Sequence, residues 1–107
     1  MKLTDKELQI MAVLWDSELP MTASEIIEAS NNRTWKEASI YIIMSTLIKK
    51  GAIVLTHHKS TSTNSARAYR PALTSAECTA LYINGVTESG IHIDINELIK
   101  HLKAKKE

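Results

Sequence analysis

The side chains best suited to chemistry in this 107-residue sequence are cations, and they are concentrated in one stretch. Of the thirteen lysines and arginines, seven lie between residues 32 and 70, where Glu37 is the only acidic residue. Residues 1–31 instead carry two lysines and six acidic residues. Concentrated positive charge is what a polyanion-binding surface requires, because Lys and Arg neutralise phosphates and release counterions. A solvated basic face without a ligand is the alternative.

Metal, redox and catalytic chemistry have weaker support. Adjacent residues of a strand point to opposite faces of a sheet, so His57 and His58 cannot readily hold one ion and no metal site is predicted. The single cysteine, Cys78, is expected to be a buried thiol, and a redox-responsive thiol that meets its symmetry mate in a dimer is the alternative. No nucleophile–base pair, Gly-rich phosphate loop or acid–base carboxylate pair is evident. The sequence therefore predicts neither an enzyme nor a cofactor.

The basic stretch is predicted to form a helix followed by a β-hairpin. Thr34 and Glu37 have the spacing of a capping box, which would open a helix of about sixteen residues. Gly51 then supplies the left-handed residue that commonly ends a helix. Two short β-prone runs follow around a polar tip, at residues 52–56 and 66–70. A helix that leads into a two-stranded hairpin is the layout of a winged helix.

Two more helices are predicted before this one. Thr4 with Glu7, and Thr22 with Glu25, form capping boxes that open a first helix of about twelve residues and a second of about eight. The first helix carries an apolar stripe at helical spacing, which predicts a core face: Leu8, Met11, Ala12 and Trp15, widened by Ile10, Val13 and Leu14. Three helices in this order predict a helix-turn-helix in which the third is the recognition helix.

The third helix divides into an inward and an outward face. The inward stripe is predicted to be Ile40, Ile43, Met44, Leu47 and Ile48. Small polar side chains and lysines outside it can reach base edges and phosphates, and the hairpin can lie along the DNA backbone. The predicted DNA-binding residues are Arg33, Thr34, Lys36, Ser39, Tyr41, Ser45, Thr46, Lys49, His58, Lys59 and Arg67. Because Tyr41 and Ile42 are less polar than a usual base-reading surface, we expect weak or shape-based discrimination.

The C-terminal residues are predicted to form two further helices. Thr74 with Glu77 opens one that ends near Asn84 and Gly85, and Asp94 caps the last. The last helix carries a full apolar stripe, which must be buried against something. We expect it to pair with a second copy of the chain, and folding back onto its own domain is the alternative. The predicted dimerisation residues are Cys78, Leu81, Tyr82, Ile95, Leu98, Ile99 and Leu102.

The expected fold is mainly α with a small β-hairpin. Residues 1–72 are predicted to be a winged helix DNA-binding domain, and residues 73–107 a helical dimerisation region. A chain of 107 residues can bury one modest core, which fits one domain with an appendage. The sequence has no long apolar run and no secretory leader, so a cytoplasmic protein is expected.

Several short segments carry a family resemblance. They are Thr4 to Trp15, Thr22 to Ile27, Thr34-Trp35, Leu47 to Gly51, His57 to Lys59, and Tyr69 to Pro71. Together they resemble the penicillinase repressor family, the BlaI and MecI type that also includes the copper-responsive CopY repressors, over about residues 3 to 72. The resemblance implies a winged-helix repressor that binds a palindromic operator as a homodimer, with the helix face from Thr34 to Thr46 in the groove.

The resemblance also implies how such a repressor is assembled and released. The helices after the hairpin would form the dimer interface, and release would follow cleavage by a membrane-anchored sensor protease or loss of a bound metal. The paired cysteines of the copper-type repressors are absent, since Cys78 is the only cysteine. The sequence identifies no upstream sensor.

The recognition helix departs from the family pattern. Where the family usually has a lysine or threonine pair, a glutamine and an arginine, this chain has Ala38-Ser39, Tyr41 and Thr46. The hairpin is also several residues longer, and the tail lacks a middle segment. The operator sequence is therefore not transferable. A winged-helix protein-interaction module with little or no sequence-specific DNA binding is the alternative hypothesis.

Overall fold

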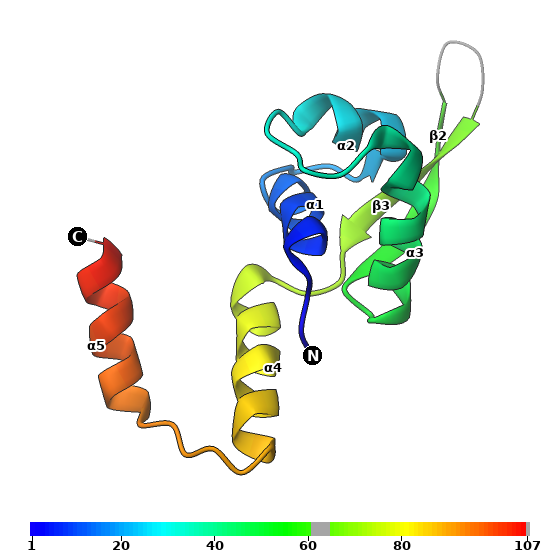
Figure 1. Cartoon of the computed structure of the whole chain (residues 1–107). Coiled ribbons are helices and arrows are strands. Elements are labelled where there is room, and N and C mark those ends of the chain that lie inside the picture. The colour runs from blue at the N-terminus through cyan, green and yellow to red at the C-terminus, as the bar shows by residue number, and fades with distance from the viewer. Residues whose placement is uncertain (61–64, 107) are drawn as a thin grey trace.

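The computed structural model describes the backbone of residues 1–60 and 65–106, and the side chains of residues 1–56 and 66–104. This part of the chain contains five α-helices and a three-stranded antiparallel sheet, which confirms the predicted fold class (Figure 1). The elements in chain order are α1 (Asp5–Trp15), β1 (Met21–Thr22), α2 (Ala23–Ala29), the 3₁₀ turn η1 (Glu37–Ser39), α3 (Ile40–Lys49), β2 (Ile53–Ser60), β3 (Ser65–Pro71), α4 (Ser75–Glu88) and α5 (Ile95–Lys106).

Capping boxes open three of the helices, as predicted. Thr4, Thr22 and Thr74 each accept a hydrogen bond from the amide three residues on, and the glutamate at that position accepts one from the threonine amide. Asp94 caps α5 through one hydrogen bond, accepting from the Glu97 amide at 3.1 Å. Gly51 follows α3 with a φ of +77°, which confirms the left-handed residue predicted there.

The start of the third helix differs from the prediction. The side-chain amide of Gln9 accepts from the Thr34 amide at 3.0 Å and donates to Thr34 Oγ1 at 2.9 Å. Glu37 pairs with Arg33 at 3.3 Å. The predicted capping box is therefore wrong, because both of its members are held by other residues. The chain enters the helix through an extended Lys36 and one 3₁₀ turn, and α3 is ten residues long.

The sheet contains a strand that the sequence did not predict. β1 pairs with β3 through Met21–Tyr69 and Thr22–Ala68, so the strand order is β1-β3-β2. β2 and β3 pair along their length with one irregularity near the middle of β2. The extra strand joins the turn before α2 to the hairpin, and this fixes the hairpin relative to the helices.

The core lies between the first three helices and the sheet. Its fully buried large side chains are Ile10, Met11, Leu14, Ile26, Ile40, Met44, Leu47 and Ile53. The buried face of α1 is rotated from the predicted stripe, because it includes Glu7 and leaves Leu8 and Ala12 exposed. Ile48, predicted to face inward on α3, is also exposed.

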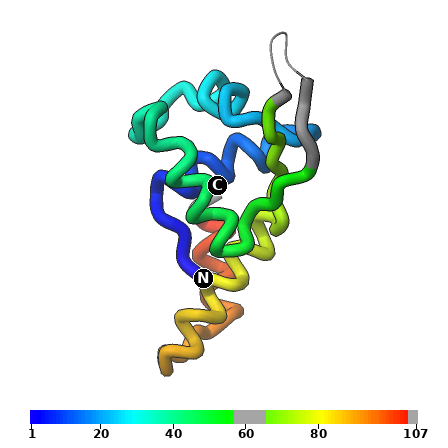
Figure 2. Tube along the Cα trace, turned by 90° about the vertical axis from the view of Figure 1, so that its right-hand side faces the viewer, coloured from blue at the N-terminus to red at the C-terminus, as the bar shows by residue number. Residues whose placement is uncertain are grey.

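The helices α4 and α5 form an arm that extends from the rest of the chain (Figures 1 and 2). The start of α4 packs on the body, because Cys78 is buried in the same core cluster as α1 and α3. The helix continues beyond its predicted end at Asn84 and Gly85 to Glu88. α5 then stands apart in Figure 1 instead of folding back. Three of its apolar side chains are 44–53% exposed: Ile95, Ile99 and Leu102.

Candidate nucleic-acid interface

The exposed face of α3 is the first component of the candidate site. Its core-facing side consists of Ile40, Met44 and Leu47. At about 3.6 residues per turn, the opposite side carries Ile42, Ser45 and Lys49. Ser45 and Lys49 are exposed, and Tyr41 and Ile42 in the first turn are 67% and 72% exposed. This face is therefore apolar in its first turn and basic at its end.

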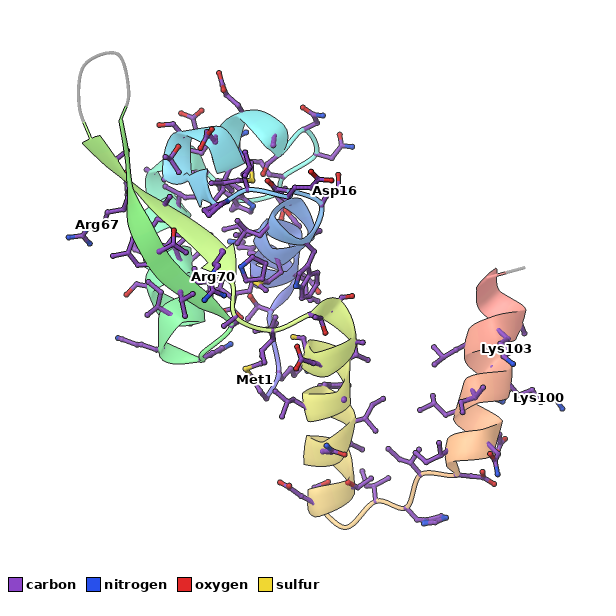
Figure 3. The ribbon with its side chains drawn as sticks, turned by 180° about the vertical axis from the view of Figure 1, so that it is seen from behind. Met1, Asp16, Arg67, Arg70, Lys100 and Lys103 are labelled. Carbon is purple, nitrogen blue, oxygen red and sulfur yellow. The ribbon has the colours of Figure 1, made fainter. Side chains whose placement is uncertain are left out.

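The hairpin lies beside this face. β2 and β3 run alongside α3 and extend toward the end of the molecule where α3 begins (Figures 1 and 2). Arg67 is exposed on β3, and Figure 3 shows its side chain pointing away from the body. A cavity of about 430 Å³ lies between the start of α2, the first turn of α3 and the hairpin. It is lined by Thr22, Ala23, Ser24, Tyr41, Ala66, Arg67 and Tyr69.

One lining residue was not predicted. Ser24 is an exposed hydroxyl in the first turn of α2, beside Tyr41 and Arg67 in the same cavity. Its position follows from the pairing of β1 with β3, which brings the start of α2 against the hairpin. The Thr22 capping box places Ser24 at a helix start, and that was the one signal the sequence offered for it.

Arg33 is held within the protein. Its Nη1 donates to the carbonyls of Ile27 and Ser30 at 3.2 and 3.3 Å, at the end of α2. Its Nη2 pairs with Glu37, and the guanidinium carbon lies 5.2 Å from the ring centroid of Trp35. In this conformation Arg33 ties the end of α2 to the start of η1. A DNA contact from Arg33 stays a prediction.

Lys50 is also engaged within the fold. Its Nζ lies 2.7 Å from Oε1 of the buried Glu7 and donates to the Lys2 carbonyl at 3.0 Å. Burial raises the pKa of Glu7, but the hydrogen bonds from Lys50 and Thr4 and the Lys50 charge outweigh burial, and the pKa lies below its ordinary value. Glu7 and Lys50 therefore join the start of α1 to the end of α3. The sequence offered no signal for this pair, whose members are 43 residues apart.

The remaining hydroxyls and cations of the predicted site differ in availability. Thr34 is bonded to Gln9, and Thr46 Oγ1 donates to the Ile42 carbonyl at 3.1 Å. Ser39 and Thr46 are half-buried. The exposed members with described side chains are Thr34, Lys36, Tyr41, Ser45, Lys49 and Arg67. The backbones of His58 and Lys59 pair with Arg67 and Ala66 in the hairpin, but their side chains lie outside the described residues.

The predicted dimerisation residues fall into two groups. Cys78 packs into the core of its own chain, and burial raises the pKa of its thiol. The others lie farther along the arm, where Leu98 is half-buried and Leu81 and Tyr82 are exposed. Within the described residues, no three His, Cys, Asp or Glu side chains are grouped to hold a metal ion. No helix in that part of the chain has the length and apolar character needed to cross a membrane.

Three packed helices, with the last exposed beside a β-hairpin, define a winged helix-turn-helix, a class of fold that places its recognition helix in a DNA groove. Comparison with known proteins gives the family. The chain belongs to the penicillinase repressor family, whose model matches residues 3–107, and this confirms the resemblance. The family is one of DNA-binding transcriptional repressors.

One curated relative is the penicillinase repressor of Bacillus licheniformis. The two sequences are 40% identical over 58 residues, which are 54% of this chain and 44% of that protein. The match therefore spans less than half of the relative's length.

Proposed function

We propose that this protein is a transcriptional repressor that binds a palindromic DNA operator as a homodimer. The observation that carries the proposal is a set of exposed cations: Lys36 directly before η1, Lys49 at the end of α3, and Arg67 on the adjacent hairpin, where Figure 3 shows its side chain. Phosphate contacts from such cations position a recognition helix in the groove. Membership of a repressor family supports the same function.

The internal contacts of Arg33 and Lys50 limit the charge that is free to meet DNA. Of the seven cations between residues 32 and 70, Arg33 and Lys50 are engaged within the fold, and Arg70 donates to the carbonyl of the adjacent Pro71 at 3.2 Å. If Lys36, Lys49, Lys59 and Arg67 each meet one phosphate, the logarithm of the association constant should fall with the logarithm of salt concentration with a slope of about 3 to 4 per protomer. A slope of about 6 per protomer would mean that all seven cations take part.

The salt dependence of operator binding tests the proposal. Lys36→Ala, Lys59→Ala and Arg67→Ala should each lower the slope by about one unit per protomer, because each removes one phosphate contact. The measurement is the anisotropy of a labelled duplex at several salt concentrations. Lys103→Ala is the control, since Lys103 lies on the arm, apart from Arg67 (Figure 3). Binding that ignores salt, or an equal loss in the control, contradicts the proposal.

The second candidate function is a winged-helix protein-interaction module. The exposed Tyr41 and Ile42 favour it, because charged and polar residues usually dominate a DNA-reading face. Selection of bound fragments from the genome of the source organism separates the two functions. A recovered palindrome supports the repressor, whereas a selection without enrichment supports the interaction module.

A further inference from the structure

We propose that Ile42 is a specificity-determining residue that recognises the 5-methyl group of a thymine in each operator half-site. The inference rests on the proposed DNA-binding function and adds the chemistry by which α3 distinguishes bases. It depends on what the exposed face of α3 offers and on what it lacks.

Before Lys49 at its C-terminal end, the exposed face of α3 lacks the side chains that read purines by paired hydrogen bonds. Arg or Lys recognises guanine and Asn or Gln recognises adenine in this way, and residues 40–48 contain none of them. The polar residues in this range besides Tyr41 are Ser45 and Thr46, and Thr46 donates its hydroxyl hydrogen to the Ile42 carbonyl. The major groove offers one further contact that needs no hydrogen bond, which is apolar contact with the thymine methyl group.

Ile42 has the position for that contact. It lies in the first turn of α3, opposite the buried side, and is 72% exposed. The N-terminal residues of a recognition helix are those that reach base edges. Tyr41, the neighbouring exposed apolar residue, lines the cavity beside Arg67 and Tyr69 on the hairpin side. Ile42 does not line that cavity, and in the proposed complex it faces the major groove of the DNA.

Contact with a methyl group would remove the apolar surface of Ile42 from water. Thymine carries this methyl group, whereas cytosine and uracil do not, so the contact distinguishes among pyrimidines. The charges around Ile42 favour DNA over an apolar protein partner, since the exposed Lys36 lies just before η1 and the exposed Lys49 lies at the end of α3. An apolar contact framed by phosphate-binding cations fits a DNA groove.

The experiment removes single methyl groups from the DNA. A duplex is first selected from a random-sequence library with the full-length protein. It is then resynthesised with each thymine replaced in turn by deoxyuridine, which keeps the base-pairing groups and the phosphate charge. At one thymine per half-site, the Kd should rise about fourfold, which corresponds to about 0.8 kcal/mol for a buried methylene-sized group.

The protein variants assign the effect to Ile42. In Ile42→Ala, the thymine and deoxyuridine duplexes should bind equally well at that position. Leu19→Ala is the matched control, because Leu19 is also 72% exposed but lies between α1 and β1, and it should keep the fourfold difference. Circular dichroism and an unchanged salt slope verify that Ile42→Ala is folded and still meets the backbone.

Each contrary outcome has a separate meaning. A selected duplex with no deoxyuridine-sensitive position, or a sensitivity that persists in Ile42→Ala, overturns the role of Ile42 and leaves the repressor function standing. A selection that enriches no sequence overturns the sequence-specific function, and the role of Ile42 fails with it.

Discussion

Glu7 combines two roles that are usually separate. As the third residue of the capping box it accepts from the Thr4 amide at 2.8 Å, and the same oxygen lies 2.7 Å from Lys50 Nζ. The carboxylate is buried, whereas its cation is partly exposed. This buried acid keeps its charge because the contacts with Lys50 and Thr4 together outweigh the loss of water. The pair therefore contributes to stability through α1 and α3 together.

Glu7→Gln should lower the free energy of unfolding at neutral pH by about 2 kcal/mol, because it removes a charge-assisted hydrogen bond. The pKa of Glu7 is lower in the folded state than its ordinary value of 4.5, so its stabilising contribution is present above pH 4.5 and is lost as the pH falls through the lowered pKa. Urea unfolding at a series of pH values should therefore show a shallower acid dependence in Glu7→Gln.

Glu77→Gln provides the matched control for this experiment. Glu77 occupies the same capping position in α4 but is exposed and has no cation in a described contact. Its loss should cost much less than that of Glu7. Equal losses for the two variants would mean that the Lys50 pair adds nothing to the cap.

At the scale of elements, the sequence predicted what depends on local pattern. The capping threonines of α1, α2 and α4 hold as predicted, and so does Gly51. Thr34 and Glu37 have the same spacing but form no cap, because Gln9 and Arg33 compete for them. A four-residue motif gives no information about residues elsewhere in the chain that can bind the same side chains. β1 was missed because two residues cannot show an alternating pattern.

The same limit applies to the candidate site. Charge along the chain located the basic helix and hairpin, but it did not distinguish Lys49, which is exposed, from Lys50, which pairs with Glu7. Adjacent residues on a helix differ by about 100° in direction, so a small error in rotation reassigns a whole face. Ile48 shows this error, because it was expected inside and is exposed.

Gln9→Ala tests the link between α1 and the start of α3. The two hydrogen bonds to Thr34 are exposed, so their loss should lower the free energy of unfolding by about 1 kcal/mol. Looser positioning of α3 should weaken operator binding by at most about fivefold. The salt slope should not change, because no charge is removed. Anisotropy titrations at several salt concentrations measure both quantities.

Thr34→Ser is the control for the Gln9 experiment. It keeps the hydroxyl that accepts from Gln9, and its affinity should stay near that of the parent protein. A reduced salt slope in Gln9→Ala would argue instead that this side chain contacts the DNA backbone.

At the scale of the whole molecule, the protein consists of a compact body and an extended arm. The described residues span 53 × 30 × 24 Å, and α4 is the part of the arm that contacts the body, through the buried Cys78 and through Met1, whose amine donates to the Leu81 carbonyl. The half-exposed stripe on α5 is the surface that the proposed dimer would cover. Aliphatic surface of this kind favours association, because removing it from water is favourable and the gain is mainly in entropy.

Replacing Ile99 and Leu102 together by Asp should yield a monomer, because two charges cannot be buried in an aliphatic interface. Sedimentation equilibrium should report half the parent mass, and operator binding should weaken. Lys100→Asp, an equally exposed change on the same helix, should leave the mass unaltered. If the double variant keeps the parent mass, α5 is not the interface.

The uncovered stripe on α5 also bears on the fate of a single chain in the cell. A lone polypeptide presents water-repelling residues on a segment with few tertiary contacts, which is the kind of target that proteases and aggregation act on. If the proposed dimer covers this stripe, dilution would lengthen the time that each newly made copy spends as a single chain. Its lifetime should therefore rise with its abundance, so that scarce copies are cleared faster than plentiful ones.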